Sequence, residues 1–570
     1  MELGEMFHCN FAFPFAHHTE VVIQQLFCGQ PRTSHAMSYL LKKPCSHVGC
    51  PKHAIGTLFH CGTCSKVWCL EHFHAYPPHV CRTLILASFK AGGEKADQIC
   101  EKIGVKTSND KHAYQRTVEA IDSHKITQQA SLIRPGHTCS LVIPSMPDGD
   151  CPTASAEYKI GWVNIHLTLI FDDGVKWIVR IPRRHNGDAP ASLHNLVASS
   201  EAATLRVLHQ NRAKVPNAWM PVEGNPDEAA NGRYFFEEFV EGVPYIDGDY
   251  MNTLHPDRDR FAVSLLEFAQ HYIAVANIKL EVKGIGSLYP SDNSCGYTLG
   301  PITSMGTFMR PEPPYFLGPF KTLKDRYIAH IEQALFHIRN LSFFIIYPIQ
   351  TYVWLLELQD IIKECEVLGR EEDDFYIRHA DDWHRQTMRD SEDHLTGCLD
   401  WEWAYTTTKA EAFSSPLNLH IAHPWAEGDN ALNPDELLMV DCFIKLGRPD
   451  LGDCIRQGRL YLRLEEALRI DRELFYMNRR GNFNGVFAAF RDQGQQVPGP
   501  FGSDEELNVW LESLEKKRRE NGELDEVRAT WKAYIDVRQK ADRREEETWK
   551  DVVAEQYKKL GLGEVISAEK

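Results

Sequence analysis

Two short segments contain the residue types that phosphoryl transfer requires. The segment "RHADDWHRQTMRD", residues 378–390, places Asp381 and Asp382 between two histidines, and "GCLDWEWA", residues 397–404, places Asp400 after an apolar run. Phosphoryl transfer needs a cation that faces the phosphates, a base near the nucleophile and acids that hold a metal ion. Asp381 can accept the proton of a substrate hydroxyl, and Asp400 can bind Mg²⁺. The alternative is that Asp381 and Asp382 form a solvated surface turn.

Residues upstream of these segments can supply the cation. The stretches "GWVNIHLTLIF" and "VKWIVRIP" alternate apolar and polar residues around the turn "DDG", which predicts two antiparallel strands. Residues 192–212 then show the apolar spacing of an amphipathic helix. Arg180 on the second strand can face the phosphates, and Glu201 on the helix can pair with it. The alternative is that these two residues form an ordinary structural ion pair.

The order of these parts resembles the catalytic region of the aminoglycoside phosphotransferase and choline kinase-like superfamily. Its motif reads His-x-Asp, then Asn five positions after the Asp, then an apolar strand that ends in Asp-Trp-Glu, and "HADDWHRQTMRDSEDHLTGCLDWEWA" aligns with it without a gap. The resemblance covers residues 156–480, and "AFSSP", residues 412–416, resembles the fungal branch. It implies a two-lobed protein-kinase-like fold that uses ATP and magnesium. The implied catalytic residues are Asp381 and Asp400, and the implied nucleotide-binding residues are Arg180, Glu201, Gln386 and Asp400.

Several departures from the family pattern keep a second function open. Gln386 stands where the family has its metal-binding Asn, and its amide is one methylene further from the backbone. Arg180 replaces the usual Lys and presents a planar fork instead of a compact ammonium. The nucleotide-covering turn holds a single glycine, Gly161, and His384 offers an imidazole as an alternative metal ligand. The alternative function is a catalytically weak or inactive kinase-like protein that acts as an adaptor.

Cysteines and histidines near the N-terminus follow the spacing of metal ligands. Residues 45–81 combine thiol and imidazole groups at short intervals, and this is the ligand set that Zn²⁺ prefers. The alternative is a cluster of reduced cysteines without metal. The order of the ligands resembles the AN-1-type zinc finger, which implies two zinc ions and contacts with a protein partner. The implied ligands are Cys45, Cys50, Cys69 and His72 for one ion and Cys61, Cys64, His79 and Cys81 for the other, with His74 as an alternative ligand.

Composition excludes some classes of partner. At 570 residues the chain is too long for one ordinary core, and its net charge of -17 argues against a general nucleic-acid binder. The apolar stretch 341–356 is too short to span a bilayer, and the N-terminus has acidic residues where a secretory signal has basic ones. We therefore expect no nucleic-acid or membrane partner and an intracellular, cytoplasmic location. There, the sixteen cysteines serve as thiols or metal ligands instead of disulfides.

The pattern along the chain predicts an α+β protein, with a two-lobed kinase-like domain, a small N-terminal zinc-finger module and a helical C-terminal extension. The predicted parts are a zinc finger at 40–85, a connector at 86–155, an N-lobe at 156–245, a C-lobe at 246–480 and the extension at 481–570. The helices predicted in the C-lobe include 258–279, 323–340 and 350–366. The expected partners of this domain are a nucleotide and a small-molecule or protein acceptor.

The extension contains two apolar stripes at helical spacing. One consists of Leu507, Trp510, Leu511 and Leu514, and the other of Leu524, Val527, Trp531, Tyr534 and Ile535. Between them the charges are mixed in sign, which is typical of a solvated helix face. We expect these helices to pack either on the C-lobe or on a partner.

Overall fold

The computed structural model divides into two compact units, which are Met1–Phe59 with Val67–Lys106 and Tyr534–Lys570, and His60–Lys66 with Thr107–Ala533. The structure describes residues 117–143, 164–182, 191–222, 234–245, 258–304, 316–340, 348–382, 386–420, 423–468 and 479–532, together with short strand backbones between 42 and 67. Almost all of the described residues therefore belong to the second unit.

The N-terminal segment is described only as strand backbone. β1 (Lys42–Pro44) pairs antiparallel with β2 (His53–Ile55), and β3 (His60–Cys61) pairs with β4 (Lys66–Val67). The side chains of the predicted zinc ligands between positions 45 and 81 lie outside the described residues. The two zinc ions therefore remain a prediction.

A five-stranded sheet forms the core of the strand-rich part, and its strand order is β5-β6-β7-β9-β8. The strands are β5 (Cys139–Val142), β6 (Asn164–Phe171), β7 (Lys176–Pro182), β8 (Ala218–Trp219) and β9 (Phe235–Glu238). The hairpin of β6 and β7 confirms the alternating pattern in the sequence. β5 lies in the range predicted as a connector, because four residues among turn formers give no clear alternation.

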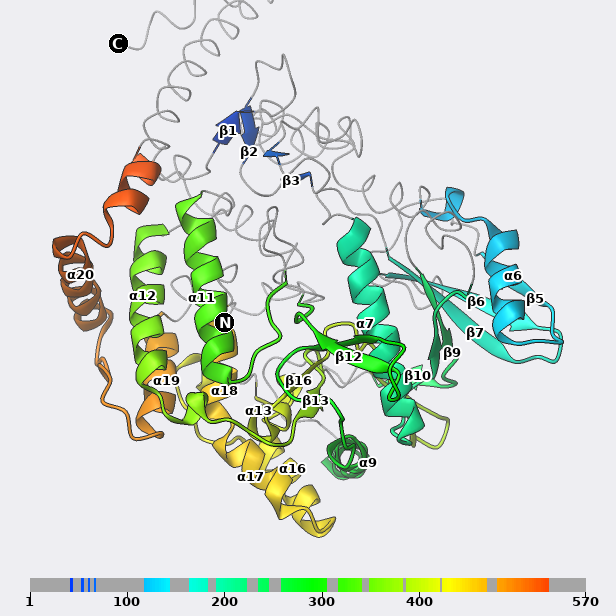
Figure 1. Ribbon diagram of the computed structural model, residues 1–570. Helices are drawn as coiled ribbons and strands as arrows, with labels where there is room; N and C mark the ends of the chain where they lie inside the picture. The colour runs from blue at the N-terminus through cyan, green and yellow to red at the C-terminus, as the bar shows by residue number, and fades with distance from the viewer. Residues whose placement is uncertain are drawn as a thin grey trace, which may run out of the picture. The chain divides into compact units, whose positions relative to one another are not determined.

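Helices cover both faces of this sheet. α6 (Ser123–Ile133) and α7 (Ala191–Gln210) lie on opposite sides of it (Figure 1). Successive strand residues point to opposite faces, so Phe236 packs with Ile126 of α6, whereas Phe235 belongs to the core that contains Ala202 of α7. The second core continues into the helical part of the chain. The face covered by α7 is therefore the one directed at the helical lobe.

The helical lobe confirms the helices predicted from apolar spacing. Its long helices are α9 (Arg258–Ala276), α11 (Leu323–Arg339), α12 (Pro348–Glu364), α16 (Pro434–Lys445), α17 (Pro449–Gln457), α18 (Arg459–Ala467) and α19 (Arg479–Arg491). The shorter helices are η3 (Val367–Gly369), α13 (Lys409–Ala412), α14 (Leu417–His420) and α15 (His423–Ala426). Within the residues that the structure describes, no helix is long and apolar enough to cross a membrane.

Small sheets within this lobe hold the loops of the site. β14 (Thr387–Arg389) lies between β10 (Val243–Pro244) and β15 (Leu395–Cys398), β13 (Tyr376–Arg378) pairs with β16 (Tyr405–Thr407), and β11 (Ser287–Pro290) pairs with β12 (Tyr297–Gly300). β10 directly follows β9 of the large sheet, so this is where the chain crosses between the lobes.

A glycine allows the crossing chain to approach the backbone of β14 closely. Gly242 has φ of +125°, and a Cβ atom there would lie 2.3 Å from the carbonyl oxygen of Arg389. No side chain fits at that distance, and the positive φ also favours glycine. The crossing is thereby fixed against β14, which leads away from the predicted catalytic loop.

The C-terminal extension packs on the helical lobe. α20 (Asp504–Glu520) lies beside α12 and buries Leu507, Leu511 and Leu514 (Figure 1). Arg518 lies 2.7 Å from Glu357 and 2.8 Å from Asp360 of α12. The indole of Trp531 donates a 2.9 Å hydrogen bond to the carbonyl of Ile338 in α11. Of the two expectations for the extension, packing on the C-lobe holds for its described part.

Candidate active site

His379 supports the loop that carries Asp381. Its Nε2 atom lies 2.9 Å from the carbonyl oxygen of Leu399, so Nε2 carries the proton and donates it. The other ring nitrogen then accepts a 3.2 Å hydrogen bond from the backbone N–H of Asp381. The ring also packs on Trp401 at 4.4 Å between centroids. His379 thus joins the loop to the segment that carries Asp400, and its role is structural.

The two adjacent aspartates have different surroundings. Asp382 is buried and accepts a 2.5 Å hydrogen bond from the hydroxyl of Tyr272 and a 3.0 Å bond from the backbone N–H of Leu417. Asp381 is half-buried and accepts a 3.3 Å hydrogen bond from Nε2 of Gln386. The pair is therefore no solvated surface turn. Asp382 anchors the loop to the helical lobe, and Asp381 faces the other candidate site residues.

Asp400 adopts a strained backbone conformation at the end of β15. Its φ is +69°, a region that costs a non-glycine residue about 1 kcal/mol. The flanking chain holds this conformation, because Leu399 donates its N–H to the carbonyl of Gln386 at 2.8 Å and the Trp401 indole donates to the carbonyl of Cys398 at 3.2 Å. The Asp400 side chain remains 29% exposed. Strain at a partly exposed carboxylate points to a functional position.

Arg180 is the cation of this cluster. Its Nη2 atom lies 2.5 Å from Oδ1 of Asp400 and 3.4 Å from Oε2 of Glu402, and its Nε atom lies 3.2 Å from Oε2 of Glu201. The guanidinium is buried, so it joins the sheet and α7 to the loop after β15. The structure therefore forms the Arg180–Glu201 pair predicted from the sequence and adds two further carboxylates to it.

Glu402 is a buried member of the site. It is 4% exposed and accepts a 2.8 Å hydrogen bond from Nδ2 of Asn164. Asn164, at the start of β6, was not recognised from the sequence. Its position next to the single-glycine turn was the available signal. Glu402 thus contacts Nη2 of Arg180, whereas Glu201 contacts Nε, and Asn164 holds Glu402 in place.

Carboxylates outnumber the positive charge at this site. Burial opposes ionisation of Asp400, but the charge and hydrogen bond of Arg180 outweigh burial and lower the pKa of Asp400. Burial and the nearby charge of Asp400 raise the pKa of Glu402 to about 7. Burial likewise raises the pKa of Glu237 on β9 to about 7. With Glu201, four carboxyl groups surround one arginine, an arrangement that favours an additional cation.

Gln386 connects the two predicted catalytic acids. Its Nε2 atom donates to Oδ2 of Asp400 at 3.0 Å and to Oδ2 of Asp381 at 3.3 Å. The longer side chain therefore reaches both carboxylates with the nitrogen end of its amide. His384, the alternative ligand beside it, lies outside the described residues. The candidate site residues Arg180, Glu201, Asp381, Gln386 and Asp400 form one connected group of contacts.

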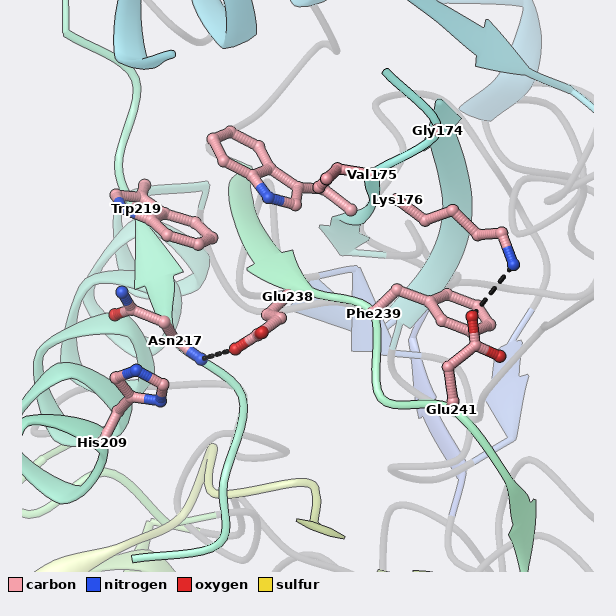
Figure 2. Close-up of a pocket in the computed structure, with 10 residues that line it drawn as sticks. Gly174, Val175, Lys176, His209, Asn217, Trp219, Glu238, Phe239 and Glu241 are labelled. Carbon is pink, nitrogen blue, oxygen red and sulfur yellow. Dashed lines mark hydrogen bonds and ion pairs between the residues drawn. The ribbon is translucent and has the colours of Figure 1, made fainter. Parts of the chain in front are cut away.

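A separate pocket of about 370 Å³ lies where the β6–β7 turn approaches the end of α7 and the end of β9 (Figure 2). Trp177 and Trp219 stack in its wall with ring centroids 4.2 Å apart. Lys176 pairs with Glu241 at 3.0 Å, and Glu238 accepts a 3.3 Å hydrogen bond from the N–H of Asn217. Lys176, Glu238 and Glu241 thus already have partners within the pocket, and Nδ1 of the half-buried His209 lies 3.2 Å from the carbonyl oxygen of Val215.

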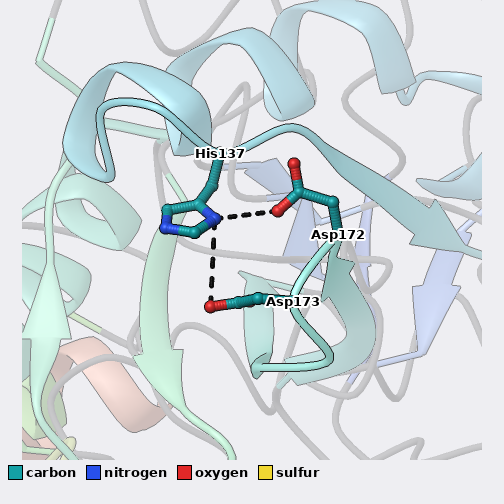
Figure 3. A group of neighbouring side chains, drawn as sticks. All are labelled: His137, Asp172 and Asp173. Atoms are coloured by element: carbon teal, nitrogen blue, oxygen red, sulfur yellow. Dashed lines mark hydrogen bonds and ion pairs between the residues drawn. The ribbon is translucent and has the colours of Figure 1, made fainter.

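A small group of metal-type side chains lies at the turn between β6 and β7 (Figure 3). Nδ1 of His137 is 2.8 Å from Asp172 and 3.8 Å from Asp173. Asp173 also forms a two-pronged ion pair with Arg134, and Asp172 accepts a 2.9 Å hydrogen bond from the N–H of Thr138. These contacts satisfy both acids, and they account for the group as a brace between the turn and the start of β5.

No family model matches the chain, and no curated protein sequence gives a significant match. Solved structures match at low identity. For an ethanolamine kinase from Plasmodium vivax, the TM-score is 0.35 at 13% identity over 59% of this chain and 82% of that chain. A thermostable mutant of an aminoglycoside phosphotransferase in complex with ADP and hygromycin B matches with a TM-score of 0.34 at 15% identity, over 65% of this chain and 97% of that chain. The GDP complex of an aminoglycoside 2'-phosphotransferase matches with a TM-score of 0.34 at 12% identity, over 65% of this chain and 99% of that chain. Matches at this level do not assign the chain to a family.

Proposed function

We propose that this protein is a phosphotransferase that uses ATP and Mg²⁺. The observation that carries the proposal is the continuous group of contacts from Glu201 through Arg180, Asp400 and Gln386 to Asp381. It combines a fixed cation, a partly exposed acid and a second acid in one place, and these are the parts that phosphoryl transfer requires. The acceptor of the phosphoryl group is a small molecule or a protein.

The side chains at the site suit magnesium. Mg²⁺ prefers oxygen ligands and keeps part of its water shell, so one or two carboxylates are sufficient. Asp400 would be the principal ligand, and Glu402 would be a further oxygen donor within the group. Gln386 presents the nitrogen of its amide to Asp400 and Asp381, so this amide would have to turn to supply an oxygen ligand. When bound, Mg²⁺ would neutralise charge on the nucleotide phosphates. The excess of carboxylates around Arg180 supports this assignment.

Asp381 would act as the base. It is half-buried, and its carboxylate lies on the Gln386 side of the loop, whereas the carboxylate of Asp382 is already bonded to Tyr272 and Leu417. The Nη2 atom of Arg180 would move from Asp400 to the phosphates, while the Nε atom of Arg180 stays paired with Glu201. The protein groups thus orient the nucleotide and accept one proton.

The test is Mg²⁺-dependent ATP binding and turnover by the full chain, its Asp400→Asn variant and a surface control, Asp373→Asn. We expect Asp400→Asn to lose Mg²⁺-linked binding and the control to retain it, because Asp373 is exposed. A native protein that shows no Mg²⁺-linked nucleotide binding would contradict the enzyme. It would then be a kinase-shaped adaptor, which is the function that the Arg180 contact on Asp400 and the loss of the family's Asn favour.

The predicted zinc module would add protein contacts to this enzyme. We propose that residues 40–85 bind two Zn²⁺ ions and recruit a protein partner, on the basis of the ligand spacing and its resemblance to the AN-1-type finger. Such a short segment cannot bury enough apolar surface to fold alone, so metal binding would supply its folding energy.

A further inference from the structure

Glu411 is a buried acid that the proposed chemistry does not use. It lies on the short helix α13 and is 1% exposed. Four side chains donate hydrogen bonds to its carboxylate, and these are Nη1 of Arg326 at 2.6 Å, the hydroxyl of Tyr327 at 2.9 Å, the hydroxyl of Tyr405 at 3.2 Å and the hydroxyl of Thr407. Burial opposes ionisation, but the charge of Arg326 and the donated hydrogen bonds outweigh burial and lower the pKa of Glu411. Its carboxylate is therefore ionised and held in one position.

The strands β13 and β16 connect this carboxylate to both proposed catalytic acids. Arg378, the last residue of β13, lies opposite Tyr405, the first residue of β16. Asp381 follows Arg378 by three residues, and Asp400 precedes Tyr405 by five residues. Both acids therefore extend from the same end of this strand pair. The position of one strand against the other sets where the two acids lie.

One face of this strand pair is directed at Glu411. Tyr405 and Thr407 are two residues apart on β16, so their side chains share a face, and both donate to the Glu411 carboxylate. Arg378 lies opposite Tyr405 and points to the same face. Its Nη1 atom donates to the backbone carbonyl of Glu411, and its Nη2 atom lies 2.8 Å from Glu465 of α18. Glu411 thus binds β13 through its backbone and β16 through its side chain.

Glu411 also fixes the strand pair to the helical lobe. Arg326 and Tyr327, which donate to its carboxylate, are residues of α11. The guanidinium of Arg326 also lies 4.4 Å from the centre of the Tyr405 ring. α13 itself packs on both strands (Figure 1). One residue therefore joins three elements that approach the site from different parts of the chain.

We propose that Glu411 is a positioning residue that sets the separation of Asp381 and Asp400 by holding β13 and β16 together. This assignment rests on the proposed phosphotransferase function, because it concerns the acids of that reaction. Displacement of a reacting group by about 1 Å can lower a rate by about a hundredfold. Arg180 and Glu201 lie on β7 and α7, outside this strand pair. Loss of the contacts should therefore lower kcat far more than it changes the KM for ATP.

The test measures Mg²⁺-dependent ATP hydrolysis and amide hydrogen exchange in the native full chain and in four variants. Glu411→Gln keeps the shape of the side chain and removes its charge. Tyr405→Phe removes one bond to Glu411 and keeps the ring. Tyr376→Phe is the matched control, because Tyr376 lies opposite Thr407 in the same strand pair and its hydroxyl is not a donor to Glu411. Trp531→Ala is the control for stability lost far from the site.

We expect Glu411→Gln to lower kcat about a hundredfold and to change the KM for ATP less than about threefold. Amide exchange in residues 376–382 and 400–407 should become about tenfold faster or more, because these amides would open locally, while exchange in the β6–β7 hairpin stays the same. Tyr405→Phe should give smaller changes in the same direction. Tyr376→Phe and Trp531→Ala should keep the native kcat and the native exchange in these two segments.

The opposite results overturn the assignment. A native kcat in Glu411→Gln, or an equal loss of kcat in Trp531→Ala, shows that Glu411 contributes to stability alone. Unchanged exchange in both segments of Glu411→Gln shows that it does not hold the strands. If the native chain binds no ATP, the phosphotransferase function fails. If it binds ATP without hydrolysing it, the exchange rates decide the role of Glu411. If Glu411→Gln does not fold, native kcat and native exchange in Tyr405→Phe overturn the assignment.

Discussion

The Nη2 atom of Arg180 lies 2.5 Å from the Oδ1 atom of Asp400, although 220 positions separate the two residues in the chain. This contact joins the last part of β7 to the strained residue after β15. It brings the cation of the sheet onto the acid that is proposed to hold the metal ion. Binding of a nucleotide would have to redistribute this ion pair, so Arg180 and Asp400 should respond together to substitution.

Arg180→Met should both destabilise the protein and abolish nucleotide binding. Without the guanidinium, Glu201 and Glu402 remain buried without a cation, and breaking a buried ion pair in this way costs about 3 kcal/mol. Arg180→Lys keeps the charge and is the matched control. We expect it to retain Mg²⁺-linked ATP binding. Urea unfolding and equilibrium binding measure the two effects. Full stability of Arg180→Met would contradict the role of Arg180 as the central cation.

The neighbouring aspartates should respond to the same substitution in different ways. Asp381→Asn removes the proposed base, so we expect turnover to fall at least a hundredfold while stability stays near that of the native chain. Asp382→Asn weakens the bonds to Tyr272 and Leu417 and should lower the free energy of unfolding by about 2 kcal/mol. Turnover and urea unfolding of both variants provide the measurement. Equal effects of the two substitutions on stability would refute the distinction.

Gln386→Asn should bind Mg²⁺ and ATP at least as tightly as the native chain. The substitution restores the shorter amide of the resembled family at a position where the present side chain contacts both Asp381 and Asp400. Gln386→Leu keeps the bulk and removes both the donor and the oxygen ligand, so it should bind Mg²⁺-ATP more weakly. Titration with Mg²⁺ at fixed ATP concentration distinguishes them. Unchanged affinity in Gln386→Leu would show that the amide takes no part.

Metal analysis of the full chain should give two Zn²⁺ ions per molecule. In the resembled finger, Cys61 and Cys64 hold the same ion, so replacing both with serine should remove one equivalent of zinc or more. Cys295→Ser is the control, since Cys295 lies in the loop between β11 and β12 of the helical lobe. A metal-free native chain would leave the alternative of reduced cysteines.

Trp531→Ala should release the C-terminal extension from α11. The indole is 3% exposed and donates to the carbonyl of Ile338, so its removal should cost about 3 kcal/mol of unfolding free energy. Val509→Ala is the control, because Val509 is an exposed residue on α20 and should change stability by less than about 0.5 kcal/mol. Thermal unfolding followed by circular dichroism measures both. An unaffected Trp531→Ala variant would show that the contact does not stabilise the extension.

The sequence by itself determined the local elements and the chemistry available to them. Alternation around "DDG" gives the β6–β7 hairpin, and apolar spacing gives α7, α9, α11 and α12, because each of these patterns depends on neighbours within one or two turns of chain. The residue types at Arg180, Asp381 and Asp400, together with the resemblance of residues 379–404 to a family motif, likewise predicted phosphoryl-transfer chemistry. β5 was not predicted from the sequence, because its four residues form a strand through their pairing with β6 and show no clear pattern of their own.

Only the tertiary structure decided which polar residues share the site. The His-x-Asp motif already pointed to Asp381, but only the structure shows that Tyr272 of α9 and the N–H of Leu417 bind the carboxylate of Asp382 and hold it away from the site. Similarly, "YFFEEF" shows no alternation, so the face that Glu237 occupies depends on its register opposite Ile178 of β7. Long-range hydrogen bonds and burial fix these choices. Their energies depend on partners more than fifty residues away, which a local pattern does not contain.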